Sequence, residues 1–201
     1  FPQRACTIYN GKTISYRQMK DITDQLAAAF HRLGLQKGER VGLLLPNSPL
    51  FVIVYYGLLK AGAVVVAINP QYTPPEIVYQ LNDAGVEFML LMADKYEMVT
   101  AIQAQTIIRQ LIVADPQRAI IASGQRLAEQ QQHSHSLFRL QPDALWLHDL
   151  VSGGSPSQRP ERQITPDDIA LFQYSGGTTG VSKGVVATHR AVVANVYQFD
   201  A

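Results

Sequence analysis

The stretch VGLLLPNSPLFVIVYYGLLKAGAVVVAI, residues 41–68, decides the fold class. It opens with a continuous apolar run over 41–45, a pattern typical of a strand buried on both faces. An Asn-Ser-Pro helix-start signal follows, and it predicts a buried helix over 49–61. A second apolar run, rich in β-branched residues, predicts another buried strand over 63–68.

The apolar residues 50–68 also approach the length that a membrane-spanning helix needs, about 20 residues. Lys60 and Gly62 interrupt the run, however, and each half has its own helix or strand signals. We therefore interpret it as part of a hydrophobic core.

Strand and helix signals alternate along the rest of the chain. Two capping boxes, Ser15 with Gln18 and Thr73 with Glu76, predict helix starts, and Gly85 closes the second helix. This alternation predicts an α/β fold with a doubly wound, largely parallel sheet and helices on both faces. Further expected elements are strands over 88–92, 111–114 and 169–174, and helices over 94–108 and after Thr188.

The organisation changes at about residue 118, where polar, Gln-rich and then Gly/Ser/Pro-rich sequence begins. We expect a first α/β subdomain over 1–164 that ends in this irregular connection. A second subdomain is expected to start over 165–201 and to be truncated. Because the chain begins at Phe1 and stops inside an apolar run, we also expect it to be an excised piece.

Composition excludes several classes of protein. With 201 residues, 47% of them hydrophobic and 16% charged, the chain is not of disordered type. A net charge of +1 gives no field directed at nucleic acid, so no nucleic-acid partner is expected. The single cysteine, Cys6, fits a reducing compartment, and a cytoplasmic location is our default expectation.

The segment YSGGTTGVSKG, residues 174–184, has the composition of a loop that closes around phosphate. Its glycines allow backbone N–H groups to approach an anion, and hydroxyls and a lysine add donors. It is not a Walker A loop, since Lys183 lies three positions after Gly180 and is followed by Gly184. The glycine spacing also differs from the Rossmann G-x-G-x-x-G pattern.

Together with VVATHRAVVAN over 185–195, this segment resembles the signature phosphate loop of the adenylate-forming (AMP-binding) superfamily. That superfamily includes acyl-CoA synthetases, firefly luciferases and peptide-synthetase adenylation domains. Ser182 departs from the pattern, because many members have proline there. Three longer segments, over 37–49, 57–85 and 165–184, are similar to the N-terminal region of bacterial long-chain fatty acid–CoA ligases.

The resemblance implies the large N-terminal domain of an ATP-dependent ligase. A fatty-acid carboxylate would attack the α-phosphate of ATP, and CoA would then displace AMP from the acyl-adenylate. ATP, Mg²⁺ and CoA are the implied cofactors and co-substrates, and peripheral membrane contact is left open for the long acyl chains. The implied phosphate-binding residues are Ser175, Gly176, Gly177, Thr178, Thr179, Gly180 and Lys183.

The same resemblance places the adenine and ribose motifs and the catalytic lysine of the C-terminal domain beyond residue 201. We therefore assign no catalytic residue and no protein metal ligand here, and we expect the chain alone to be inactive. His133 and His135 lack cysteine or carboxylate partners in sequence and are interpreted as solvated. His189 also stays outside the candidate site.

Two alternatives remain. The adenylated acid could be an aryl or amino acid, because residues that line the acyl pocket in such enzymes fall largely after residue 201. The chain could instead be a nucleotide-binding module without chemistry of its own. Both alternatives keep the glycine-rich loop as a phosphate site.

Overall fold

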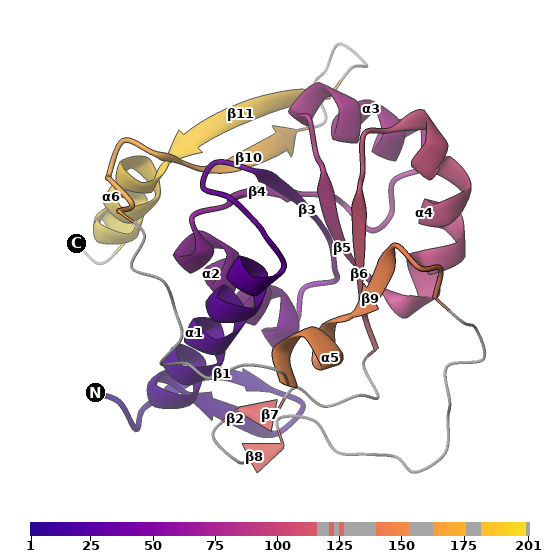
Figure 1. Cartoon of the computed structure of the whole chain (residues 1–201). Helices are drawn as coiled ribbons and strands as arrows, with labels where there is room; N and C mark the ends of the chain where they lie inside the picture. Colours follow the sequence, from indigo (N-terminus) through magenta and orange to yellow (C-terminus); the bar gives the residue numbers. More distant parts are fainter. Residues whose placement is uncertain (116–120, 123–124, 127–139, 153–162, 176–181, 200–201) are drawn as a thin grey trace.

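The computed structural model describes residues 1–115, 121–122, 125–126, 140–152, 163–175 and 182–199. Its centre is a seven-stranded sheet with the strand order β11-β10-β4-β3-β5-β6-β9 (Figure 1). These strands are β3 (Arg40–Leu44), β4 (Val64–Ala67), β5 (Phe88–Met92), β6 (Gln110–Ala114), β9 (Ala144–Trp146), β10 (Ile169–Ser175) and β11 (Lys183–Thr188).

All neighbouring pairs in this sheet are parallel except β10 with β11. The chain enters the sheet at β3, moves to β4 on one side, and returns past β3 to β5, β6 and β9 on the other. This is the doubly wound order, in which ligands bind outside the carboxyl ends of the strands. The predicted fold class is confirmed.

Helices cover both faces of the sheet (Figure 1). One core cluster joins the sheet to α1, α2 and α5, and a second joins it to α3 and α4. The bounds of the helices are α1 (Tyr16–Arg32), α2 (Pro49–Ala61), α3 (Pro74–Ala84), α4 (Tyr96–Ile102), α5 (Leu147–Ser152) and α6 (His189–Phe199). Two 3₁₀ turns, η1 (Ala93–Lys95) and η2 (Gln103–Gln105), flank α4.

The helix starts follow the sequence signals. Ser15 and Gln18 form the expected capping box at α1, and the Ser48 hydroxyl accepts from the Phe51 N–H at the start of α2. Helix α2 ends at Ala61 and is capped by Gly62, whose φ of 81° suits a residue without a side chain. The apolar run over 50–68 is thus a helix followed by strand β4, as predicted.

No helix among the described residues is long and apolar enough to cross a membrane. The helix expected over 94–108 is shorter than predicted, because η2 tightens the chain at Gln103–Gln105 and Thr106 is already extended.

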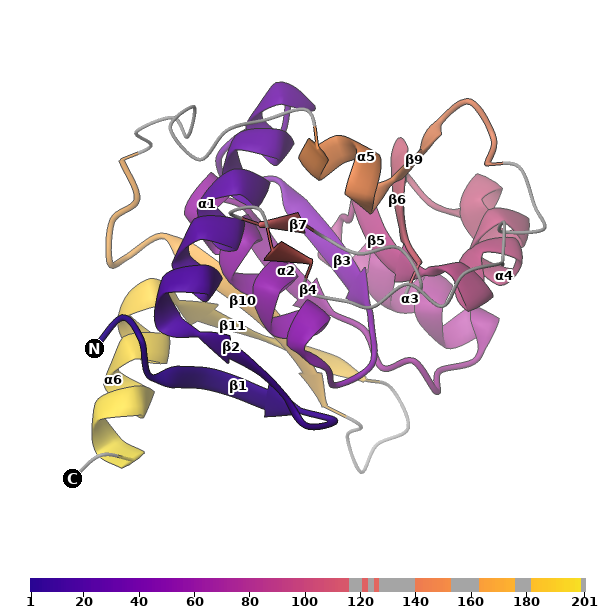
Figure 2. The same cartoon turned by 90° about the horizontal axis from the view of Figure 1, so that it is seen from below.

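Two parts of the fold were not expected from the sequence. An N-terminal hairpin, β1 (Ala5–Tyr9) with β2 (Lys12–Ser15), turns at Asn10 and Gly11, which both have positive φ. It lies beside α1 and α2 (Figure 2). The stretch predicted to be irregular contains β9 and α5, besides the short pair β7 (Ile121–Ala122) and β8 (Gln125–Arg126).

Strand β10 joins the first sheet through its parallel pairing with β4. The division of the chain at 164/165 therefore stays a prediction about the parent fold, while β10 and β11 belong to the same seven-stranded sheet as the strands before residue 164.

Candidate functional site

Strands β10 and β11 form the stem of the glycine-rich loop. They run antiparallel, and Ser175 and Lys183 are register partners at the end of the ladder. Directly opposite residues in such a pair carry their side chains on the same face of the sheet. The structure therefore brings together the first and last residues of the predicted phosphate site, and both are exposed.

The remaining predicted site residues are Gly176, Gly177, Thr178, Thr179 and Gly180, and they lie outside the described residues. The assignment of phosphate contacts to them stays a prediction. The structure describes the two strands on either side of them, β10 and β11.

A hydrogen bond closes the base of the loop. The Ser182 hydroxyl donates to the backbone carbonyl of Ser175 over 2.9 Å. A proline at this position, as many adenylate-forming enzymes have, could not make this bond. The serine therefore supplies a side-chain link across the stem in place of a rigid ring.

The stem lies at the carboxyl edge of the parallel strands. Strand β10 runs parallel to β4, with Gln173 opposite Ala67, so Ser175 leaves the sheet at the same edge as the end of β4. This is the edge where open α/β sheets bind ligands. Lys183 has no ion-pair partner among the residues that the structure describes, so its charge stays available for an anion.

The residues next to this pair are packed tightly. Tyr174 is paired with Gly184 across the stem, and its ring lies so close that a Cβ on Gly184 would come within 2.8 Å of the tyrosine Cζ. The Tyr174 hydroxyl donates to Oδ2 of Asp83, at the end of α3, over 2.5 Å. Sequence reasoning missed this contact, because nothing local links residues 91 positions apart.

Burial and the adjacent Asp83 carboxylate both raise the pKa of Tyr174 above its usual value. The hydroxyl therefore keeps its proton and remains a donor to Asp83 at all physiological pH values.

His189 is the first residue of α6 and directly follows the end of β11. With Thr165, Pro166, Val193 and Tyr197 it borders an open, mostly apolar hollow of about 540 Å³. Burial lowers the pKa of His189 and so favours the neutral form of the ring. The helix starts as expected, since the Thr188 hydroxyl accepts from the Ala191 N–H.

Within the described ranges, no three His, Cys, Asp or Glu side chains gather in a way that could hold a metal ion. Mg²⁺ in nucleotide enzymes is commonly held by one or two protein groups together with phosphate oxygens and water. The described part of the chain thus has no closed protein cage for the ion, and its hydroxyl and lysine donors suit phosphate.

Comparisons with known proteins find CoA ligases among the relatives of this chain. A long-chain-fatty-acid–CoA ligase of Escherichia coli O157:H7 is 32% identical over 196 residues, which cover 95% of this chain and 35% of that protein. The 4-coumarate–CoA ligase 2 of Oryza sativa subsp. japonica is 32% identical over 199 residues, covering 98% of the chain and 33% of that protein.

Among solved structures, a long-chain-fatty-acid-CoA ligase (FadD1) from Archaeoglobus fulgidus matches with a TM-score of 0.77 and 26% identity. The match covers 98% of this chain and 36% of that one. The chain thus spans about a third of the length of the curated relatives that it matches. A family model described as AMP-binding enzyme matches residues 1–201, and the chain belongs to this family.

Proposed function

We propose that the full-length protein, meaning the protein that contains this chain, is an ATP-dependent ligase that joins a long-chain fatty acid to CoA. The observation that supports the proposal is the Ser175–Lys183 stem: these two residues flank the glycine-rich sequence, and the stem lies at the edge where open α/β sheets bind ligands. The E. coli relative supports a fatty acid as the substrate class.

The reaction has two steps. A carboxylate oxygen of the acid attacks the α-phosphorus of ATP, the bond to the β-phosphate oxygen breaks, and pyrophosphate leaves. The CoA sulfur then attacks the carbonyl carbon of the acyl-adenylate, and AMP departs with the bridging oxygen. Both reactants of the first step are anions, so the site must hold them in line and balance the charge that moves onto pyrophosphate.

The residues of this chain act on the leaving group. Lys183 supplies a positive charge, and Ser175 and the threonines at 178 and 179 supply hydroxyl donors to the β- and γ-phosphates. The glycines allow backbone N–H groups to approach the same oxygens. Mg²⁺, carried in with ATP, would add charge neutralisation at the phosphates.

The test is acid-dependent pyrophosphate release by the full-length protein, with short, medium and long fatty acids, aryl acids and amino acids, each with and without CoA. A rate that peaks with long fatty acids supports the proposal. A rate of pyrophosphate release that is the same with and without an acid contradicts it.

A second candidate keeps adenylation and changes the acid to an aryl acid. The rice 4-coumarate–CoA ligase supports it, because its identity to the chain equals that of the E. coli fatty-acid ligase. The same substrate panel distinguishes the two candidates.

A third candidate is a nucleotide-binding module without chemistry. Titration of the 201-residue chain with Mg-ATP tests it: saturable binding by this chain, together with silence of the full-length protein towards every acid, would favour it.

A further inference from the structure

Tyr174 connects three elements through one side chain. It belongs to β10, its ring lies against Gly184 of β11, and its hydroxyl bonds Asp83 of α3. Tyr174 is buried, with 7% of the residue exposed. It therefore fixes the end of the stem to the body of the fold.

The contact of Tyr174 with Gly184 lies directly beside the two candidate phosphate-binding residues, Ser175 and Lys183. Tyr174 directly precedes Ser175, and Gly184, against which the tyrosine ring packs, directly follows Lys183. Each of the two candidate phosphate-binding residues is therefore next to a residue that takes part in this contact. The contact lies on the α3 side of the sheet. Ser175 and Lys183 point to the opposite face, because side chains alternate along a strand.

The hydrogen bond is of the strong kind. A phenol donates to a carboxylate over 2.5 Å, and such charge-assisted bonds are about twice as strong as neutral ones. Among the described residues, Asp83 has no other hydrogen-bond or ion-pair partner. The side-chain amide of the neighbouring Asn82 donates to the Gln105 carbonyl, which links this end of α3 to η2. The Asp83 carboxylate therefore accepts from the Tyr174 hydroxyl at a position that α3 holds in place.

We propose that Asp83 and Tyr174 are positioning residues for the phosphate loop. Through this bond α3 holds the end of β10, and through the ring–Gly184 contact it also holds the start of β11, so that Ser175 and Lys183 stay in register. This inference rests on the proposed function. In-line phosphoryl chemistry loses rate steeply when a group moves by about 1 Å, so a small displacement of the stem matters.

The test uses Asp83→Ala, Asp83→Asn and Tyr174→Phe in the full-length protein. Asp83→Ala and Tyr174→Phe are each expected to lower kcat/KM for ATP by about tenfold, the effect of losing a hydrogen bond to a charged group. The KM for the acid should not change. Asp83→Asn retains an acceptor oxygen and should recover most of the loss.

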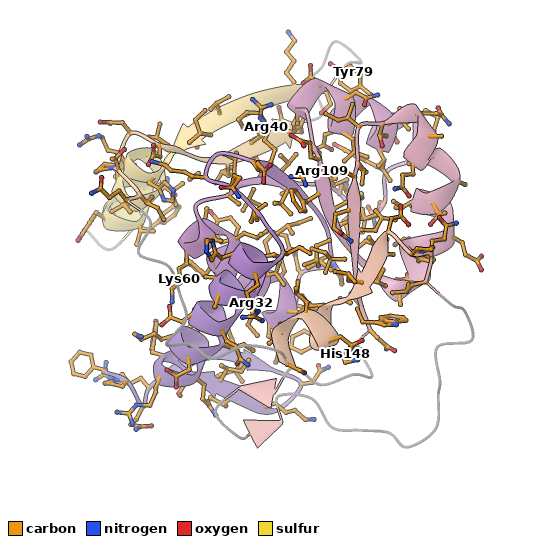
Figure 3. The ribbon with its side chains drawn as sticks, in the orientation of Figure 1. Arg32, Arg40, Lys60, Tyr79, Arg109 and His148 are labelled. Carbon is orange, nitrogen blue, oxygen red and sulfur yellow. The ribbon has the colours of Figure 1, made fainter. Side chains whose placement is uncertain are left out.

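The double variant, Asp83→Ala with Tyr174→Phe, should be no worse than either single change, because both remove the same bond. Tyr79→Phe is the matched control. Tyr79 lies on α3, the helix that carries Asp83, where Figure 3 labels it, and is 42% exposed. Losing its hydroxyl should leave kcat/KM for ATP unchanged.

Equal kcat/KM for ATP in wild type and Tyr174→Phe would overturn the proposal. So would losses in Asp83→Ala and Tyr174→Phe that multiply in the double variant. If Asp83→Ala does not fold, Tyr174→Phe and Asp83→Asn still decide the question.

A second readout separates this inference from the proposed function. Amide hydrogen exchange at 174–175 and 182–184 should speed up at least tenfold in Tyr174→Phe, with the strands β3 and β5 unaffected. That result supports positioning even if the full-length protein shows no acid-dependent chemistry. Unchanged exchange at the stem would overturn the positioning role whatever the activity.

Discussion

Gly184 lies directly against the ring of Tyr174, where a Cβ would come within 2.8 Å of the ring carbon Cζ. The φ of Gly184 is not positive, so its backbone conformation does not require a glycine. The ring of Tyr174 does require one, because it occupies the space that a side chain would need. It is therefore a packing requirement of the loop stem, placed one residue after Lys183.

Replacement of Gly184 by alanine should lower the free energy of unfolding by about 1–3 kcal/mol, the usual effect of overpacking. Strand propensity alone would favour alanine over glycine. The measurement is the denaturant midpoint of the full-length protein. In a Tyr174→Ala background the penalty should vanish, since the ring is gone, and a penalty that persists there would contradict the steric account.

Asp24 in α1 makes the fold sensitive to acid. It is 5% exposed and accepts hydrogen bonds from the ammonium groups of Lys20 and Lys60, each over 2.7 Å; Lys60 is labelled in Figure 3. Burial by itself would raise the pKa of the carboxyl, but the two lysines outweigh it and hold the pKa below its usual value.

A carboxyl whose pKa is lower in the folded state stabilises the fold above its unfolded pKa, and this stabilisation disappears as the pH falls through the folded pKa. We expect the unfolding free energy to decline below about pH 4 for this reason. Asp24→Asn should cost about 1–3 kcal/mol at pH 7 and flatten the decline. An identical pH profile for wild type and Asp24→Asn would refute the assignment.

Helices α1 and α2 approach each other closely at Gly57. A Cβ there would meet the Leu26 Cβ at 2.8 Å, and Leu26 is fully buried. Gly57→Ala should therefore destabilise the protein by about 1–3 kcal/mol, as measured by thermal or denaturant unfolding. Helix propensity alone predicts the opposite, an increase of about 1 kcal/mol in the free energy of unfolding. A stabilised Gly57→Ala variant would therefore contradict the steric account, because α1 and α2 would have moved apart without a loss of stability.

Lys183 should act on the phosphates and not on the fold. Lys183→Ala is expected to lower kcat/KM for ATP by about tenfold or more without moving the unfolding midpoint, because the side chain is exposed and has no ion pair within the described residues. Lys95→Ala, at the turn before α4, removes a charge elsewhere and serves as the control. Equal losses in both variants would indicate a general charge effect.

Much of the fold could be predicted because its signals are local. The Ser15–Gln18 and Thr73–Glu76 capping boxes, and the proline at the start of α2, set helix starts within a few residues of sequence. Long apolar runs identified the parallel strands, since strands buried on both faces carry little else.

Some of what was missed did have a signal. The Asn10–Gly11 pair is a hairpin-turn sequence, and the structure places a turn there between β1 and β2. Strand β9 is only three residues long, and α5 only six, so neither shows a measurable periodicity.

Part of the candidate site could also be predicted from the sequence, and part could not. The loop sequence identified Ser175 and Lys183, and the structure pairs them. The bond from Tyr174 to Asp83 joins residues that only tertiary packing brings together, so no local pattern could predict it.

The central claim is that the acid is activated as an adenylate. The most direct measurement follows carboxylate oxygen in one turnover of the full-length protein with ¹⁸O-labelled fatty acid, ATP and CoA. If carboxylate oxygen attacks the α-phosphorus, one labelled oxygen must appear in the phosphate of AMP, and pyrophosphate must stay unlabelled. Label in orthophosphate with ADP as the other product, or no label in AMP while thioester forms, would contradict the claim.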